Sequence, residues 1–77
     1  MNLTITQIDK VLRSGEAFSV TVPAAGGEMT ILSHHMPLIT TLKKGTIIVR
    51  EEGKPDASFP IESGFLEVGK VETVILV

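Results

Sequence analysis

The sequence predicts an all-β domain, a small flattened two-layer β-sandwich of short antiparallel strands. Ile, Val and Thr occur eight times each among the 77 residues, and such β-branched side chains pack well on a sheet but lose rotamer freedom in a helix. Four prolines divide the middle of the chain into pieces too short for a stable helix. Turn signals recur about every ten residues, as in small sandwiches and barrels.

Nine strands are expected in chain order. The first alternates Leu3 and Ile5 with threonines, and the third alternates Phe18, Val20 and Val22 with hydroxyl residues. Such period-two alternation predicts one buried face and one solvated face. The expected strands cover residues 2–8, 10–13, 17–23, 28–32, 38–42, 45–51, 57–62, 64–68 and 71–76.

The strands over 47–49 and 74–77 are apolar on both faces. This pattern predicts strands that are covered on each side or that end against a partner. Phe18, Phe59 and Phe65 lie in apolar segments and are expected in the core.

Two of the expected turns contain glycine. Ser14-Gly15 is expected to separate the second and third strands. Gly69-Lys70 is expected to form a two-residue hairpin turn, because glycine readily adopts the positive φ that a type II′ turn requires.

Length and composition indicate a single domain over residues 1–77, without repeats or linkers. A formal charge of −2 provides no basic field for nucleic acid. The absence of cysteine excludes a disulfide framework and agrees with a reducing compartment. No apolar run approaches the ~20 residues of a membrane span, and no secretory signal is present. We therefore expect no direct membrane insertion. If the chain works near a membrane, we expect it to dock to another protein.

The only candidate for metal binding or acid–base chemistry is Ser33-His34-His35. Adjacent strand residues point to opposite faces, so the two imidazoles could share a metal only in a tight turn. A third ligand at usable spacing is missing. We therefore expect no metal site, and interpret the pair as a loop histidine beside one that bonds a backbone carbonyl.

Other catalytic motifs are absent. Glu51-Glu52 precedes Gly53-Lys54-Pro55-Asp56 and is interpreted as a solvated hairpin tip. Gly26-Gly27 lacks the flanking sequence of a P-loop. We expect no cofactor and no enzymatic activity. Two classes of protein remain. One is a protein-binding module, and the other is a stand-alone small β-barrel that binds a small ligand or nucleic acid. The low aromatic content argues against the second class, because single-stranded nucleic acid stacks on aromatic side chains.

Several segments match one family pattern in order and spacing. They are Val11 to Glu16, Val20 to Pro23, Gly27-Glu28, Ile31-Leu32, His35, Pro37-Leu38, Leu42, Gly45, Gly64 to Val68 and Val71 to Leu76. Together they resemble the N-terminal β-sandwich domain of the epsilon subunit of F-type ATP synthase, over essentially the whole chain. The chain departs from the family pattern at Ala24, Thr30 and Ser33-His34, and the sequence stops at Val77, before the two-helix C-terminal domain that family members commonly have.

The resemblance implies a non-catalytic rotor component of the central stalk. Such a subunit binds the gamma subunit and the loops of the membrane c-ring, couples ion translocation to ATP synthesis or hydrolysis, and lies peripherally on the cytoplasmic side of the energy-coupling membrane. It implies a gamma-facing surface that includes Met36 and Leu38, which are alternatively core residues. The c-ring side that it implies comprises Gly26, Gly27, Glu28, Met29, His34 and His35.

Overall fold

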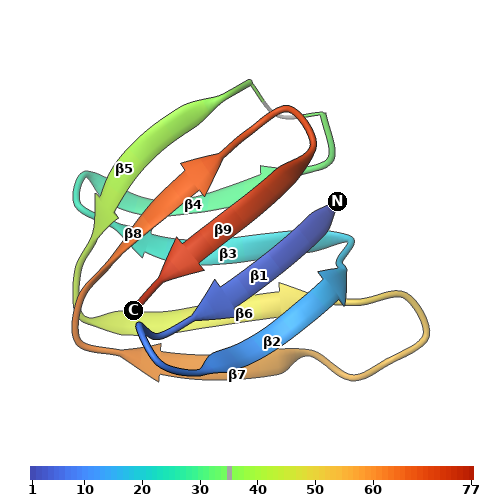
Figure 1. The fold of residues 1–77 in the computed structure, drawn as a ribbon, viewed down its shortest axis with the longest axis horizontal. Coiled ribbons are helices and arrows are strands. Elements are labelled where there is room, and N and C mark those ends of the chain that lie inside the picture. The colour runs from blue at the N-terminus through green and yellow to red at the C-terminus, as the bar shows by residue number, and fades with distance from the viewer. Residues whose placement is uncertain (35) are drawn as a thin grey trace.

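The computed structural model describes residues 1–34 and 36–77. These residues form an all-β domain, as predicted, with nine strands and no helix (Figure 1). The strands are β1 (Asn2–Thr6), β2 (Val11–Glu16), β3 (Ser19–Ala24), β4 (Gly27–Leu32), β5 (Leu38–Leu42), β6 (Gly45–Arg50), β7 (Ala57–Ile61), β8 (Gly64–Val68) and β9 (Glu72–Leu76). Each coincides with one predicted strand, and the ends differ by at most three residues.

The strands form one hydrogen-bonded sheet in the order β2-β1-β9-β8-β5-β3-β6-β7, and β4 pairs with β3. The sheet folds over between β5 and β3, which are linked by the single residue pair Leu42 and Ala24. One layer is therefore β2-β1-β9-β8-β5, and its strands cross those of the second layer, β4-β3-β6-β7 (Figure 1). The molecule measures 28 × 24 × 24 Å, so the expected flattening is slight.

One strand pair corrects the expectation of an entirely antiparallel sheet. β1 lies parallel to β9, from the Asn2–Glu72 pair to the Thr6–Leu76 pair, whereas the other pairings of the described strands are antiparallel. Parallel neighbours need a long connection, and here all the intervening strands supply it. The first and last strands thus lie side by side inside one layer.

The core lies between the two layers. Leu3 and Ile5 of β1 are buried and alternate with more exposed threonines, as predicted. Each fully buried aliphatic side chain contributes about 1.5–3 kcal/mol relative to an exposed one. The fully buried large side chains are Leu3, Ile5, Val20, Val22, Ile31, Ile47, Val49, Leu66 and Ile75.

β3 differs from the prediction, because Ser19 and Thr21 are buried together with Val20 and Val22. β3 lies between β4 and β6, so larger side chains on both neighbours shield the small hydroxyl groups. The hydroxyl groups of Thr21 and Thr30 lie 2.9 Å apart in a hydrogen bond. The outer face of this strand is therefore covered by its own layer.

The three phenylalanines do not all belong to the core. Phe59 is partly buried against it, but Phe18 is 66% and Phe65 is 55% exposed. Phe18 precedes β3 instead of lying within it. In β8 the buried positions are Leu66 and Val68, so alternation directs Phe65 outward.

Both predicted glycine turns are wrong in detail. Ser14 and Gly15 lie inside β2 and pair with Thr4 and Leu3, and Gly15 has a φ of 134°, which glycine adopts without a Cβ clash. The connection between β8 and β9 comprises residues 69–71, and the N–H of Gly69, whose φ is not positive, donates to the Glu72 carbonyl over 2.9 Å.

Candidate docking surfaces

The tip of the β3–β4 hairpin carries part of the predicted c-ring set. Ala24 pairs with Gly27, which leaves Ala25 and Gly26 as an exposed two-residue turn. Gly27 has a φ of 133°, a conformation that other residues rarely adopt. Glu28 is exposed, whereas Met29 packs partly against the core. Gly26 and Glu28 are therefore accessible to a partner, and Met29 much less so.

The histidine part of that set lies elsewhere. His34 follows the other end of β4, about 20 Å from the hairpin tip at the ~3.3 Å rise of each strand residue. It is exposed and has a φ of 65° in a turn. His35 lies outside the described residues. The structure thus does not bring His34 together with Gly26, Gly27 and Glu28.

Two lysines that sequence reasoning missed lie beside the hairpin tip. The N–H of Lys43 donates to the Pro23 carbonyl over 2.8 Å, and the N–H of Ala25 donates to the Thr41 carbonyl over 3.0 Å. Lys43 and Lys44 are exposed, and neither forms an ion pair within the described part of the chain. The paired lysines before a glycine were visible in the sequence, but not their proximity to the hairpin. We define residues 25–28 and 43–44 as the turn-end surface.

A second surface lies on the outside of the layer that contains β5, β8 and β9, which run side by side in Figure 1. Strand register places Phe65 opposite Leu76, and Glu67 opposite both Ile39 and Val74. Ile39 is 73%, Phe65 55% and Leu76 39% exposed, so the chain itself does not cover Leu76, and of the two alternatives for the last strand only contact with a partner remains as a prediction. We define Ile39, Phe65, Val74 and Leu76 as the apolar face.

An open depression of about 380 Å³ adjoins this apolar face. It is bordered by Phe65 and Leu76 and by the C-terminal Val77. Ile8, from the loop between β1 and β2, contributes a side chain that is 95% exposed. Contiguous exposed apolar side chains of this kind are typical of protein interaction sites.

The predicted gamma-side residues lie next to this apolar face. Met36 precedes β5 and is 78% exposed, which contradicts the alternative that it is a core residue. Leu38 is half-buried and packs against the core, so the alternative holds in part for Leu38. Alternation along β5 then turns the neighbouring Ile39 outward. Leu38 and Ile39 thus face opposite sides of β5, and the prediction of Leu38 as a gamma-facing residue stays a prediction.

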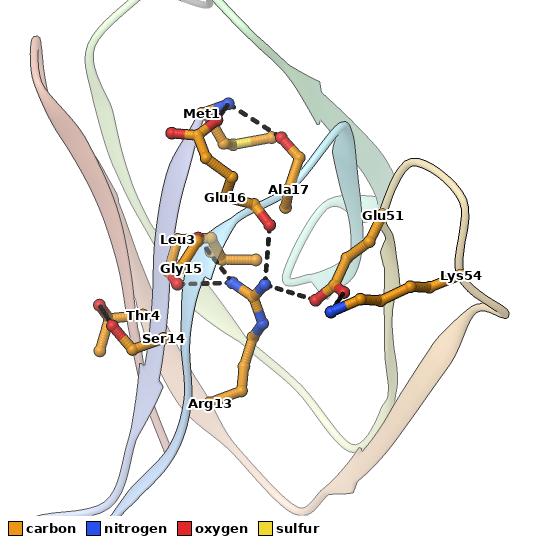
Figure 2. A network of polar contacts seen from close by, with 10 residues as sticks. All are labelled: Met1, Leu3, Thr4, Arg13, Ser14, Gly15, Glu16, Ala17, Glu51 and Lys54. Carbon is orange, nitrogen blue, oxygen red and sulfur yellow. Dashed lines mark hydrogen bonds and ion pairs between the residues drawn. The ribbon is translucent and has the colours of Figure 1, made fainter.

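A polar network joins the layers at the end remote from the hairpin tip (Figure 2). One terminal nitrogen of Arg13, Nη1, donates to the carbonyls of Leu3 and Gly15 over 2.6 and 3.0 Å. The other, Nη2, donates to the Glu16 carbonyl over 2.9 Å and to Glu51 Oε1 over 2.6 Å. The side chains of Arg13 and Glu51 are only 12% and 21% exposed. Glu51 is therefore not part of a solvated tip, unlike its exposed neighbour Glu52.

The network also sets the charge state of Glu51. The hydrogen bond from Arg13 is the largest influence and lowers the pKa of the Glu51 carboxyl below 4.5. Lys54, whose ammonium lies 3.4 Å from Glu51, lowers this pKa further, whereas burial opposes the change. The carboxylate is thus held in its ionised form.

The described residues contain no group of three or more His, Asp or Glu side chains that could hold a metal ion. They also contain no helix that is long and apolar enough to cross a membrane. What the geometry offers is two exposed surfaces on a hydrogen-bonded scaffold. The fold defines a small β-sandwich domain, and these surfaces are its candidate docking sites.

The family follows from comparison with known proteins. The protein-family model for the β-sandwich domain of the ATP synthase delta/epsilon chain matches residues 1–77. The chain therefore belongs to this family. The resemblance inferred from the sequence is therefore confirmed.

Individual relatives agree with this assignment. The ATP synthase epsilon chain of Dichelobacter nodosus is 40% identical over 73 residues, which are 94% of this chain and 50% of the relative. That of Sulfurimonas denitrificans is 38% identical over 77 residues, 100% of this chain and 59% of the relative. The chain thus spans about half the length of the curated relatives that it matches.

Solved structures share the fold. A chain in the structure of the Euglena gracilis mitochondrial ATP synthase superimposes with a TM-score of 0.89 and 27% identity, over 97% of this chain and 48% of that one. A chain of the Tetrahymena thermophila mitochondrial ATP synthase, from its central stalk and c-ring, gives a TM-score of 0.84 at 18% identity, over 100% of this chain and 62% of that one. The second likeness concerns the fold alone.

Proposed function

We propose that the chain is a non-catalytic part of the rotor of an F-type ATP synthase, where it connects the gamma subunit to the c-ring. The observation that carries this proposal is the apolar face, exposed on a domain whose relatives are ATP synthase epsilon chains. In the complex it lies peripherally, on the cytoplasmic side of the energy-coupling membrane. It couples ion translocation to ATP synthesis or hydrolysis by holding two partners in register.

The apolar face is the proposed gamma-binding surface. Ile39, Phe65 and Leu76 present three large side chains whose exposure to water is unfavourable. Met36 lies just before β5 and extends this surface with an adaptable side chain. An interface needs such a central apolar cluster with a polar rim, and exposed threonines such as Thr41 provide polar groups beside it.

The turn-end surface is the proposed c-ring contact. Its small turn at Ala25 and Gly26 allows close backbone approach, and Glu28, Lys43 and Lys44 offer charges of both signs. Exposed ion pairs contribute only about 0–1 kcal/mol each, so these charges orient the ring loops more than they hold them. The hydrogen bonds between the two turns keep the charges in a fixed arrangement.

The two surfaces are tested separately in the assembled complex. Glu28→Lys is expected to reduce proton-pumping coupling while assembly with gamma is retained. Glu72→Lys makes the same charge change on an exposed residue at the opposite end of the sandwich and should leave coupling unchanged. Normal coupling with Glu28→Lys, or equal losses with both variants, would remove Glu28 from the ring contact.

The competing class, a stand-alone barrel that binds a small ligand or nucleic acid, makes a different prediction. Such a protein would show ligand-dependent melting and no affinity for gamma. A pull-down with purified gamma subunit separates the two classes, because the rotor proposal requires a stable complex. Tight oligonucleotide binding without gamma binding would contradict the proposed function.

A further inference from the structure

β2 is held to the sandwich in an unusual way. Among the described strands it alone has no buried residue, only half-buried and exposed ones. It lies at the edge of its layer, pairs only with β1, and its register shifts between Ile5 and Thr6. Strands with little buried surface at a sheet edge open at low free energy. Leu12 is its one side chain packed against the core, so polar contacts must provide much of its attachment.

Arg13 provides these contacts. Its guanidinium group bonds the Leu3 carbonyl on β1 and the carbonyls of Gly15 and Glu16 on its own strand. It also bonds Glu51, at the end of β6 in the second layer (Figure 2). Charge-assisted hydrogen bonds of 2.6 Å to a half-buried carboxylate are stronger than neutral ones. Arg13 thus ties β2 both to its own layer and to the opposite layer.

Glu51 introduces a second weakly packed segment. The connection between β6 and β7 comprises residues 51–56, and all of these except Glu51 are exposed. The backbone N–H of Lys54 donates to the Glu51 carbonyl over 3.3 Å, and the Lys54 ammonium group forms an ion pair with the Glu51 carboxylate. Nearby, the N–H of Phe18, in the short connection between β2 and β3, donates to the Arg50 carbonyl over 2.7 Å and extends the β3–β6 pairing toward β2. Both segments therefore depend on the same half-buried ion pair.

We propose that the Arg13–Glu51 pair is a clasp that makes β2 and the 51–56 connection a single opening unit. The two segments detach together while the rest of the sandwich stays folded. Opening makes β1 the edge of its layer, with the N–H and C=O groups that pair with β2 exposed. This device is independent of the gamma and c-ring contacts, because neither docking surface includes Arg13 or Glu51.

Native-state hydrogen exchange of the chain tests the clasp. Arg13→Gln and Glu51→Gln are each expected to accelerate exchange about tenfold at the amides of β2, Phe18 and Lys54. Amides of β8 should change less than about twofold in both variants. The double variant should exchange no faster than the faster single variant, because either substitution already breaks the clasp.

The matched control is Glu52→Gln, which removes the same charge from the exposed residue next to Glu51. Glu52 forms no ion pair within the described part of the chain, so its substitution should leave β2 exchange unchanged. If Arg13→Gln does not fold, Glu51→Gln decides alone, because it leaves the three carbonyl contacts of Arg13 in place. The proposal is overturned if Glu51→Gln accelerates Lys54 but not β2, or if β8 accelerates as much as β2.

Discussion

The backbone N–H of Lys43 donates to the carbonyl oxygen of Pro23 over 2.8 Å, and this bond fixes the β5–β6 turn against the β3–β4 hairpin. Directly after the lysines, Gly45 packs so closely that a Cβ atom there would lie 2.7 Å from Pro23 Cβ. The turn-end surface therefore depends on a glycine that carries no functional group itself. Gly45 and Pro23 lie in neighbouring strands of one layer, β6 and β3, beside the point where the sheet folds over from β5 to β3.

Gly45→Ala is accordingly expected to destabilise the fold by about 1–3 kcal/mol, because the rigid proline ring cannot move aside easily. For a domain of this size, each kcal/mol lowers the melting temperature by about 4–8 °C. The control is Gly26→Ala, since a Cβ at Gly26 meets nothing within 4 Å and its φ is not positive. Equal melting temperatures for the two variants would show that the Pro23 contact is not tight.

The acid stability of the chain should depend on Glu51. Folding lowers the pKa of the Glu51 carboxyl from its ordinary value of 4.5. The ionised carboxylate therefore stabilises the folded state at a pH above the unfolded-state pKa, and this stabilisation is lost as the pH falls through the folded-state pKa. Urea unfolding of wild type and Glu51→Gln should therefore differ most at a pH above 4.5, and the difference should shrink as the pH falls below 4.5. The exposed Glu52→Gln is the control. A difference that grows on acidification would contradict the lowered pKa.

Substitutions at Met36 and Leu66 compare a surface position with a core position. Leu66 is fully buried, so Leu66→Ala should cost about 2–5 kcal/mol in the free energy of unfolding. Met36→Glu should leave this free energy within about 0.5 kcal/mol, because the side chain is 78% exposed. Chemical denaturation measures both. Unfolding of the Met36→Glu variant would restore the core interpretation of Met36.

The sequence was sufficient to predict the positions of the strands, but not which of their side chains are buried. Alternation and turn spacing predict where each strand lies, because both are local properties of the chain. Whether Phe65 faces the core depends on which face of β8 its neighbours cover, and that is set by tertiary packing. The Gly15 turn failed for a related reason, since the residue continues a strand with a backbone conformation that also suits turns.

The candidate sites show the same limit. That Gly26 and Glu28 lie close together could be predicted, because both belong to one hairpin. Lys43 and Lys44 were missed because their contact with that hairpin joins strands distant in sequence. The pairing of Arg13 with Glu51 spans 38 positions, and nothing in the local sequence of either residue indicates it.

Binding of the chain to purified gamma subunit, measured by calorimetry, tests the central proposal most directly. Phe65→Glu should weaken binding at least about tenfold, because a charge would replace part of the apolar face. Phe18→Glu provides a matched control, since Phe18 is 66% exposed, slightly more than Phe65, but lies outside that face. The Phe18 variant is expected to bind gamma like wild type. Absence of wild-type binding, or equal weakening by both substitutions, would contradict it.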